Sequence, residues 1–145
     1  KIAGDLAATM AEQGYVYVPK SCEQGQSCTL HISFHGCNQH ADAVGMAYVE
    51  HAGFNRYADS NNMVVLYPQT RSSNLMPMNP QACWDWWGYT DANYANRKGQ
   101  QIQAVNFGSD EQTGQNQAHG RAKGVGHDTT QTLFHEGGRD AQHRF

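Results

Sequence analysis

The sequence predicts an α/β domain with a mostly parallel sheet flanked by helices. The main observation is an order of segments over residues 29–67: an apolar strand, a stretch with helical spacing, and a second apolar strand. This order is a βαβ unit, which pairs its strands in parallel. The second observation is size, because 145 residues accommodate one domain but not two.

The first expected elements are a lead-in and a strand. Apolar residues recur at roughly helical spacing over residues 1–13, but without a clear cap, so a helix remnant and an ordered lead-in both stay open. Residues 14–19 have the β-branched and aromatic composition of a strand that ends at a proline. The turn-rich residues 20–27 lead to a second strand over residues 29–34.

The second half of the βαβ unit follows. Residues 42–59 keep an approximately helical period that Gly45 and Gly53 interrupt, so we expect one or two helices, with Asp42 as the N-cap. Residues 63–67 are apolar on both faces, as is typical of a central parallel strand. A long loop over residues 70–80 comes next, and the apolar pattern of a further helix begins at residues 99–105 and stops at once.

Residues 106–145 differ in composition from residues 1–105. Only eight of these forty residues are apolar, too few to offset the entropy of ordering a chain. We therefore expect a folded domain over residues 1–105 and a disordered tail over residues 106–145. The tail histidines recur every eight residues, which fits no helix face, so a solvated tail is favoured over metal binding; they are His119, His127, His135 and His143.

Composition also excludes several function classes. The chain has 10 Lys and Arg against 13 Asp and Glu and a net charge of -3, which gives no basic face for nucleic acid. The longest apolar runs are too short to span a membrane. Residue 1 is Lys, without a leader sequence after it, so we expect that the chain is not a complete translation product and that any targeting peptide was removed or lies upstream.

Four cysteines lie in the first 105 residues: Cys22, Cys28, Cys37 and Cys83. An even number in an aromatic-rich, lysine-poor chain indicates two disulfides and a secreted protein, with all three pairings open. Zinc is the weaker alternative, because it favours pairs of cysteines with two to four residues between them, whereas 5, 8 and 45 residues intervene here. We expect no metal and no cofactor.

The segment His35-Gly36-Cys37 follows directly on the strand over residues 29–34. Ligands of open α/β sheets bind outside the carboxyl ends of the strands, and Gly36 lets the backbone turn sharply so that the next amides can face a substrate oxygen. This is the geometry of an oxyanion hole. The alternative is that Gly36 only closes a turn and that His35 is a buried, hydrogen-bonded side chain.

A second motif is aromatic. Residues 83–89, CWDWWGY, place three tryptophans and a tyrosine within seven residues, after the long loop. Such a concentration supplies large apolar area with polar handles, so we expect it to line a substrate cleft. A small core under the loop, held by Cys83, is the alternative. The candidate binding residues are Trp84, Trp86, Trp87 and Tyr89.

A serine nucleophile is not evident. The nearest approach to a G-x-S-x-G elbow is residues 25–29, GQSCT, which lack the second glycine and precede a strand where the elbow follows one. Ser109 follows Gly108 but has no apolar strand before it. The sequence therefore contains no convincing serine elbow.

Four ordered segments nevertheless resemble one family. They are GYVYVPKSC from residue 14, CTLHISFHGCNQ from residue 28, YADSNNMVVLYPQT from residue 57 and NPQACWDWWGYT from residue 79. This pattern resembles the secreted poly(3-hydroxybutyrate) depolymerases, carboxylic ester hydrolases of α/β-hydrolase fold, over roughly residues 4–105. It is most similar to the carboxyl-terminal part of their circularly permuted class.

The resemblance implies where the chemistry lies. In the permuted class the catalytic serine, aspartate and histidine precede the HGC segment, so the triad would lie in an amino-terminal half that this chain lacks. Cys37 matches the position whose backbone N–H helps to form the oxyanion hole, while His35 and Gly36 shape that turn. The tryptophans match a motif near the cleft in which the family binds an apolar polyester.

The resemblance also implies two disulfides, Cys22 with Cys28 and Cys37 with Cys83. The second would hold the oxyanion turn against the aromatic motif. Family members continue beyond Val105 with a short apolar helix, whereas here an unrelated Gly-, Gln- and His-rich sequence follows. This change resembles a frameshift or a truncated gene, and half a sheet with unpaired edges aggregates readily.

We therefore expect a secreted fragment of a serine-dependent, polyhydroxybutyrate depolymerase-like esterase, inactive alone. It would act on a polyester or small ester once its missing half is supplied. One alternative is a non-catalytic module that binds polyester or carbohydrate through the aromatic motif. Another is an esterase of the same fold that acts on feruloyl or acetyl esters.

Overall fold

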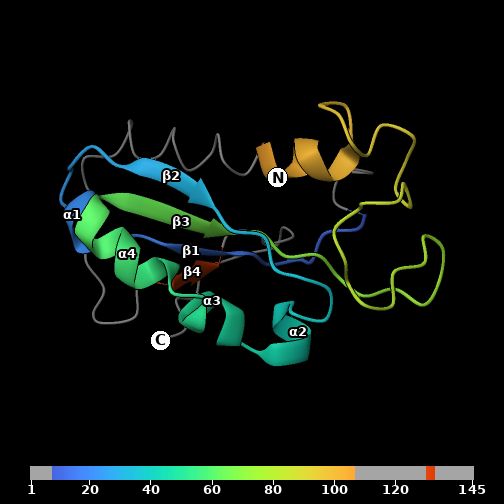
Figure 1. The fold of residues 1–145 in the computed structure, drawn as a ribbon, viewed down its shortest axis with the longest axis horizontal. Coiled ribbons are helices and arrows are strands. Elements are labelled where there is room, and N and C mark those ends of the chain that lie inside the picture. Colours follow the sequence, from blue (N-terminus) through green and yellow to red (C-terminus); the bar gives the residue numbers. More distant parts are fainter. Residues whose placement is uncertain (1–7, 107–129, 133–145) are drawn as a thin grey trace, which may run out of the picture.

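The computed structural model describes residues 8–106 and 130–132. It contains a four-stranded sheet with the strand order β2-β3-β1-β4 (Figure 1). The strands are β1 (Tyr15–Tyr17), β2 (Thr29–Ile32), β3 (Met63–Tyr67) and β4 (Thr130–Thr132). Within these residues, no helix is long and apolar enough to cross a membrane.

The βαβ unit is confirmed, but the sheet is mixed. Strands β2 and β3 run parallel, with Thr29 opposite Met63 and Ile32 opposite Leu66. Strand β1, however, pairs antiparallel with both β3 and β4. Strand β3 has neighbours on both sides and four of its five residues are buried, as its apolar pattern predicts. The expected mostly parallel arrangement thus holds only for the βαβ pair.

The helices differ from the prediction in their number and in the residue that caps the first of them. The predicted helical stretch forms α2 (Ala41–Val44), α3 (Ala47–His51) and α4 (Phe54–Asn61). Gly45 and Gly53 have φ of 61° and 89°, which is outside the helical region, so each glycine ends the regular pattern. The N-cap of α2 is His40, and Asp42 lies inside the helix; the predicted N-cap is wrong.

A fourth helix is short. The turn-rich segment 20–27 begins with α1 (Lys20–Glu23), which follows Pro19 and carries the buried Cys22. Because proline fixes φ near the helical value and tolerates the first helical turn, Pro19 both ends the β1 segment and precedes this helix.

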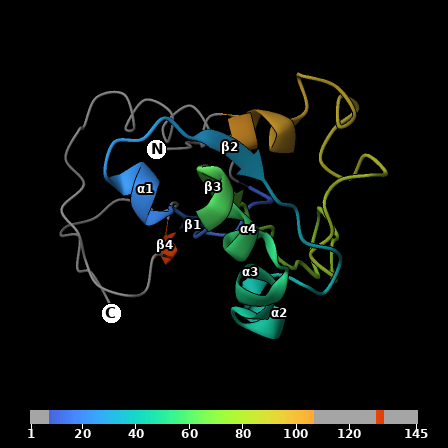
Figure 2. The same cartoon turned by 60° about the vertical axis from the view of Figure 1, so that its left-hand side comes forward.

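Apolar clusters cover both faces of the sheet. Val49 of α3 and Ala58 of α4 pack with Val65 and Tyr67 of β3 on one face, and Figure 2 shows α3 and α4 together on that side. The other face carries two smaller clusters. One joins Val16, Cys22 and Val64, and the other joins Met10, Ala104 and Val105, against which Ile32 packs.

The segments outside the βαβ unit complete the domain. Met10 forms an isolated bridge with Thr70, so the described part of the lead-in is ordered and non-helical; residues 1–7 lie outside the described residues. Residues 100–106 form the helix whose beginning the sequence indicates. Of the predicted disordered tail, residues 130–132 form β4, which corrects the prediction there, and the other residues from 107 on, including Ser109 and the tail histidines, lie outside the described part.

Candidate oxyanion turn

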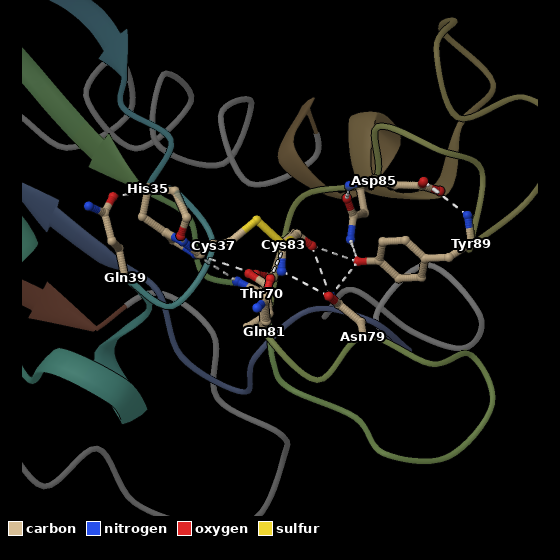
Figure 3. The surroundings of a disulfide bond; sticks show 12 residues. His35, Cys37, Gln39, Thr70, Asn79, Gln81, Cys83, Asp85 and Tyr89 are labelled. Carbon is tan, nitrogen blue, oxygen red and sulfur yellow. Dashed lines mark hydrogen bonds between the residues drawn. A yellow bond between two sulfur atoms is a disulfide. The ribbon is translucent and has the colours of Figure 1, made fainter.

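Residues 36–39 form a turn at the carboxyl end of β2, beside the loop that follows β3. Figure 3 shows His35 beside Thr70 and Cys37 beside Cys83, with the Gln39 side chain next to His35. Asn38 has a left-handed φ of 59°, which asparagine tolerates better than most residues. The expected position at the strand end is confirmed.

Most backbone amides of this turn have an internal acceptor. The Gly36 N–H donates to Gln39 Oε1 at 2.8 Å. The Asn38 N–H donates to the Gln81 carbonyl at 2.7 Å, and the Gln39 N–H to the Gly36 carbonyl at 3.1 Å. The Cys37 N–H, by contrast, donates to no residue of the described chain. Among the amides of residues 36–39, it is therefore the one without an acceptor in the described part of the chain.

His35 is buried, with 3% of its surface exposed, and its hydrogen bonds assign its tautomer. The Thr70 hydroxyl donates to the Ala82 carbonyl at 2.6 Å, so the Thr70 N–H is the donor to His35 Nε2, at 3.3 Å. An accepting Nε2 leaves the proton on Nδ1, which donates to the Gly36 carbonyl at 2.8 Å. Burial lowers the pKa of His35 below its ordinary value, with the Gly36 carbonyl opposing this and nearby His40 adding to it. His35 is thus a neutral side chain that orients the turn.

Both disulfides that the resemblance implies are present. Cys22 bonds to Cys28 and closes a local loop. Cys37 bonds to Cys83 across 46 residues of sequence, so it joins the turn to the aromatic motif, as Figure 3 shows. In the described part of the chain, no cysteine is free and no cluster of three or more His, Cys, Asp or Glu residues could hold a metal ion.

Asp85 organises the aromatic loop. One carboxylate oxygen accepts the N–H groups of Gly88 and Tyr89, and the other accepts the N–H and hydroxyl of Thr90. Burial raises the pKa of Asp85, but the hydrogen bonds from Thr90, Gly88 and Tyr89 outweigh it, so the pKa lies below its ordinary value. An ionised Asp85 therefore stabilises the turn at the end of the motif.

Tyr89 and Trp84 have structural contacts. The Tyr89 hydroxyl donates to the Cys83 carbonyl at 2.9 Å and accepts from Asn79 and Gln101. Trp84 packs against the Met10 cluster and contacts the Phe34 ring edge-on, with centroids 4.8 Å apart. Both residues thus match the alternative interpretation of the motif, a small core under the loop.

Trp86 and Trp87 have the opposite character. They are 72% and 43% exposed, and their rings contact each other at 5.2 Å between centroids. Exposed tryptophans that form a pair provide a rigid apolar surface for a ligand. The aromatic motif therefore divides into two supporting residues and two available ones.

A pocket of about 340 Å³ lies next to Thr70. It is mainly polar, and buried His40 on its wall has an Nδ1 without a partner in the described residues. Like the turn, it is near the carboxyl ends of β2 and β3, where α/β proteins bind ligands. Its lining comprises Ala11, Glu12, Gln13, Tyr15, His40, Ala41, Asp42, Gln69, Thr70 and Arg71.

Comparison of the sequence and of the structure with known proteins finds relatives of one kind. The chain is 45% identical over 98 residues to a poly(3-hydroxybutyrate) depolymerase of Delftia acidovorans and 37% identical over 105 residues to a polyhydroxybutyrate depolymerase of Talaromyces funiculosus. The crystal structure of PHB depolymerase from Penicillium funiculosum superposes with a TM-score of 0.67 at 36% identity. The chain is a homologue of the polyhydroxybutyrate depolymerases. It matches no protein-family model.

The similarity to these depolymerases is partial in length. Each match covers 66% to 71% of this chain, but only 19% and 31% of the two relatives and 36% of the solved structure. The α/β-hydrolase-like fold expected from the resemblance agrees with the depolymerase structures.

The candidate site contains residues that the sequence singles out and others that it does not. The turn and the aromatic motif are brought together by Cys37 and Cys83. Gln39 lies in the segment CTLHISFHGCNQ, but its hydrogen bond to the Gly36 N–H has no signal in the sequence. Thr70 and Gln101 carry no local signal, because their partners His35 and Thr9 are 35 and 92 residues away.

Proposed function

We propose that this chain supplies the oxyanion-binding turn of a serine-dependent carboxylic ester hydrolase of the polyhydroxybutyrate depolymerase type. The observation that carries the proposal is the Cys37 amide, which has no acceptor in the described chain while its neighbours Gly36, Asn38 and Gln39 have theirs. A free amide in an otherwise hydrogen-bonded turn is a preorganised donor for a developing negative charge.

In the proposed reaction, a serine that a histidine deprotonates attacks the ester carbonyl. The carbonyl oxygen of the tetrahedral intermediate then lies on the Cys37 N–H and a second N–H, the alcohol leaves, and water hydrolyses the acyl-enzyme to release the hydroxyacid. The chain has no G-x-S-x-G elbow. We therefore assign the serine, histidine and aspartate to a segment outside this chain, which agrees with a permuted order of segments.

The substrate in this proposal is an aliphatic polyester or a small ester. One solved relative is a PHB depolymerase complexed with an R3HB trimer, and this chain is 36% identical to it. We also propose that the protein is secreted, because two disulfides are typical of oxidising compartments.

A hybrid enzyme tests the proposal. The full chain replaces the matched 105 residues of the Talaromyces depolymerase, and hydrolysis of the R3HB trimer is measured. We expect the hybrid to be active and the chain alone to give no turnover. An inactive hybrid that is folded and carries both disulfides contradicts the proposal.

The Cys37 amide is tested within the hybrid by two double variants. C37A/C83A removes the disulfide but keeps the amide, whereas C37P/C83A removes both the disulfide and the N–H. Loss of one oxyanion donor lowers kcat by about 100-fold or more, so we expect that ratio between the two variants. Equal kcat values would show that the Cys37 amide does not contact the oxyanion.

A second candidate function is a binding module without catalysis. It is favoured by the exposed pair Trp86 and Trp87. The full chain is mixed with polyhydroxybutyrate or cellulose particles, and W86A and W87A are compared with Y57A, which removes from α4 an aromatic residue whose exposure lies between those of the two tryptophans. The binding function is favoured if the native chain and Y57A adsorb saturably, the tryptophan variants do not adsorb, and the hybrid is inactive.

A hydrolase of other esters is distinguished with the same hybrid. Feruloyl and acetyl esters are assayed beside the R3HB trimer. Faster turnover of either ester would place the chain with another esterase of this fold.

A further inference from the structure

We propose that Gln39 is a positioning residue that fixes the direction of the Cys37 amide; this inference rests on the proposed function. Gln39 contacts both sides of Gly36. Its side-chain Oε1 accepts the Gly36 N–H at 2.8 Å, and its backbone N–H donates to the Gly36 carbonyl at 3.1 Å. Figure 3 shows the Gln39 side chain extending along the turn to make this contact.

The Cys37 N–H takes its direction from the Gly36 carbonyl. Both groups belong to the same planar trans peptide, so the N–H points opposite to the carbonyl oxygen. That oxygen accepts from His35 Nδ1 at 2.8 Å and from the Gln39 N–H. Two donors to the carbonyl oxygen thus fix the orientation of this peptide, and with it the opposite direction of the Cys37 N–H.

The peptide before Gly36 needs a separate contact. Glycine rotates about its backbone bonds more freely than any other residue, so fixing the peptide that follows Gly36 does not fix the one that precedes it. The Gly36 N–H belongs to that preceding peptide, and Gln39 Oε1 holds it. Gln39 is therefore the residue that restrains both peptides around the freely rotating position.

The space around Gly36 supports the same role. A Cβ at residue 36 would lie 2.8 Å from Gln39 Oε1 and 3.3 Å from its Cδ, and the nearest atoms outside the adjoining residues all belong to the Gln39 side chain. Glycine is thus the residue that lets the Gln39 amide oxygen approach the backbone. An alanine there would displace the same side chain.

The test uses the active hybrid and the variants Q39M and Q39E. Methionine matches glutamine in length but cannot accept the Gly36 N–H, so we expect kcat of Q39M to fall about tenfold with KM unchanged, less than the loss of a whole oxyanion donor. Glutamate keeps an oxygen acceptor, so Q39E is expected to recover kcat to within about threefold of the native hybrid. Q26M makes the same exchange at an exposed glutamine near α1 and is expected to keep the native kcat.

Amide hydrogen exchange in the full 145-residue chain gives a second measurement. We expect the Gly36 amide to be protected in the native chain and in Q39E and to exchange quickly in Q39M. The variant G36A is expected to lower kcat by a similar factor, and G36A/Q39M no further, because both substitutions break one hydrogen bond.

The outcomes separate this inference from the proposed function. An inactive native hybrid overturns the proposed function and this inference with it. An active hybrid in which Q39M keeps the native kcat, or in which G36A and Q39M lower kcat independently, overturns only the role of Gln39. A folded Q39M that loses activity while Q39E retains it supports that role.

Discussion

His35 illustrates how single residues set the properties of the turn. Its two ring nitrogens are both used, one by the Gly36 carbonyl and the other by the Thr70 amide. A second proton on the ring would remove the acceptor of the Thr70 N–H, and burial already lowers the pKa of His35. Hydrogen bonding and burial therefore both keep the side chain neutral.

This predicts a pH dependence of stability. The folded-state pKa of His35 is below the value of about 6.5 for an unfolded chain, so in acid the unfolded state binds a proton that the folded state excludes. The free energy of unfolding then falls as pH decreases below that value. We expect urea titrations from pH 7 to pH 5 to show this slope in the native chain and a shallower slope in H35Q.

The matched control for H35Q is H51Q. The side chain of His51 is 77% exposed and its nearest carboxylate oxygen, on Glu50, is 3.9 Å away. We expect H51Q to keep the native slope. If H35Q also keeps it, another buried group causes the acid sensitivity.

The sequence predicts the site unevenly at the residue scale. The positions of Gly36 and Cys37 follow from an apolar strand with a glycine shortly after its end, which is local information. The partners of His35 are not predictable in this way, because Thr70 is 35 residues away and becomes a neighbour only when β2 and β3 pair. The packing of Trp84 likewise depends on Met10 and Ala104, which are distant in sequence.

At the scale of loops and helices, the aromatic loop depends on Asp85. Replacing the carboxylate with an amide in D85N removes the charge and one of the acceptors for the N–H groups of residues 88–90. We expect a loss of about 1.5 kcal/mol in the free energy of unfolding, because hydrogen bonds to a charged group are strong but this one is only partly buried. Chemical denaturation measures it.

The control for D85N is D42N, since Asp42 is exposed on α2 and surface substitutions change stability by about 0.5 kcal/mol or less. Because the pKa of Asp85 is lowered in the folded state, its contribution to stability depends on pH. Its stabilisation is present above the ordinary pKa of aspartate and is lost as pH falls through the lower folded-state pKa. A D85N variant as stable as D42N would show that the carboxylate is dispensable.

The two disulfides differ in the length of chain that they close. Their sequence separations are 46 and 6 residues. In the loop-entropy model, closing them stabilises the fold by about 4 and about 2 kcal/mol. We therefore expect C37A/C83A to lower the free energy of unfolding by about twice as much as C22A/C28A, as measured by urea unfolding under non-reducing conditions. Equal losses would mean that the unfolded chain already keeps Cys37 close to Cys83.

The elements show why periodicity alone predicts helices only in part. The apolar period extends across residues 42–59, yet Gly45 and Gly53 take positive φ values and divide the stretch into α2, α3 and α4. A glycine within a helical pattern either ends the helix or lies inside it, and the pattern does not distinguish the two cases. Helix α1 has four residues, which is too short for a periodic pattern to appear.

For the whole molecule, the direction of the first strand is the feature that sequence could not provide. The βαβ order implies parallel pairing of β2 and β3 because a helical connection lies between them. Residues 14–19 have a strand composition, but composition is the same for either direction. The structure places β1 antiparallel beside β3 and leaves its other edge to β4, a pairing with residues that the sequence assigns to a disordered tail.

That pairing predicts how truncated chains behave. Strand β4 covers the outer edge of β1, with Val16 opposite Gln131, and an uncovered edge strand pairs readily with other molecules. A chain ending at residue 106 exposes this edge, whereas a chain ending at residue 132 retains β4. We expect sedimentation velocity to show concentration-dependent association for the shorter chain and a monomer-like boundary for the longer one. If both chains sediment alike, β4 does not protect the edge of the sheet. Association of the chain is then controlled elsewhere, most directly at the opposite edge strand β2.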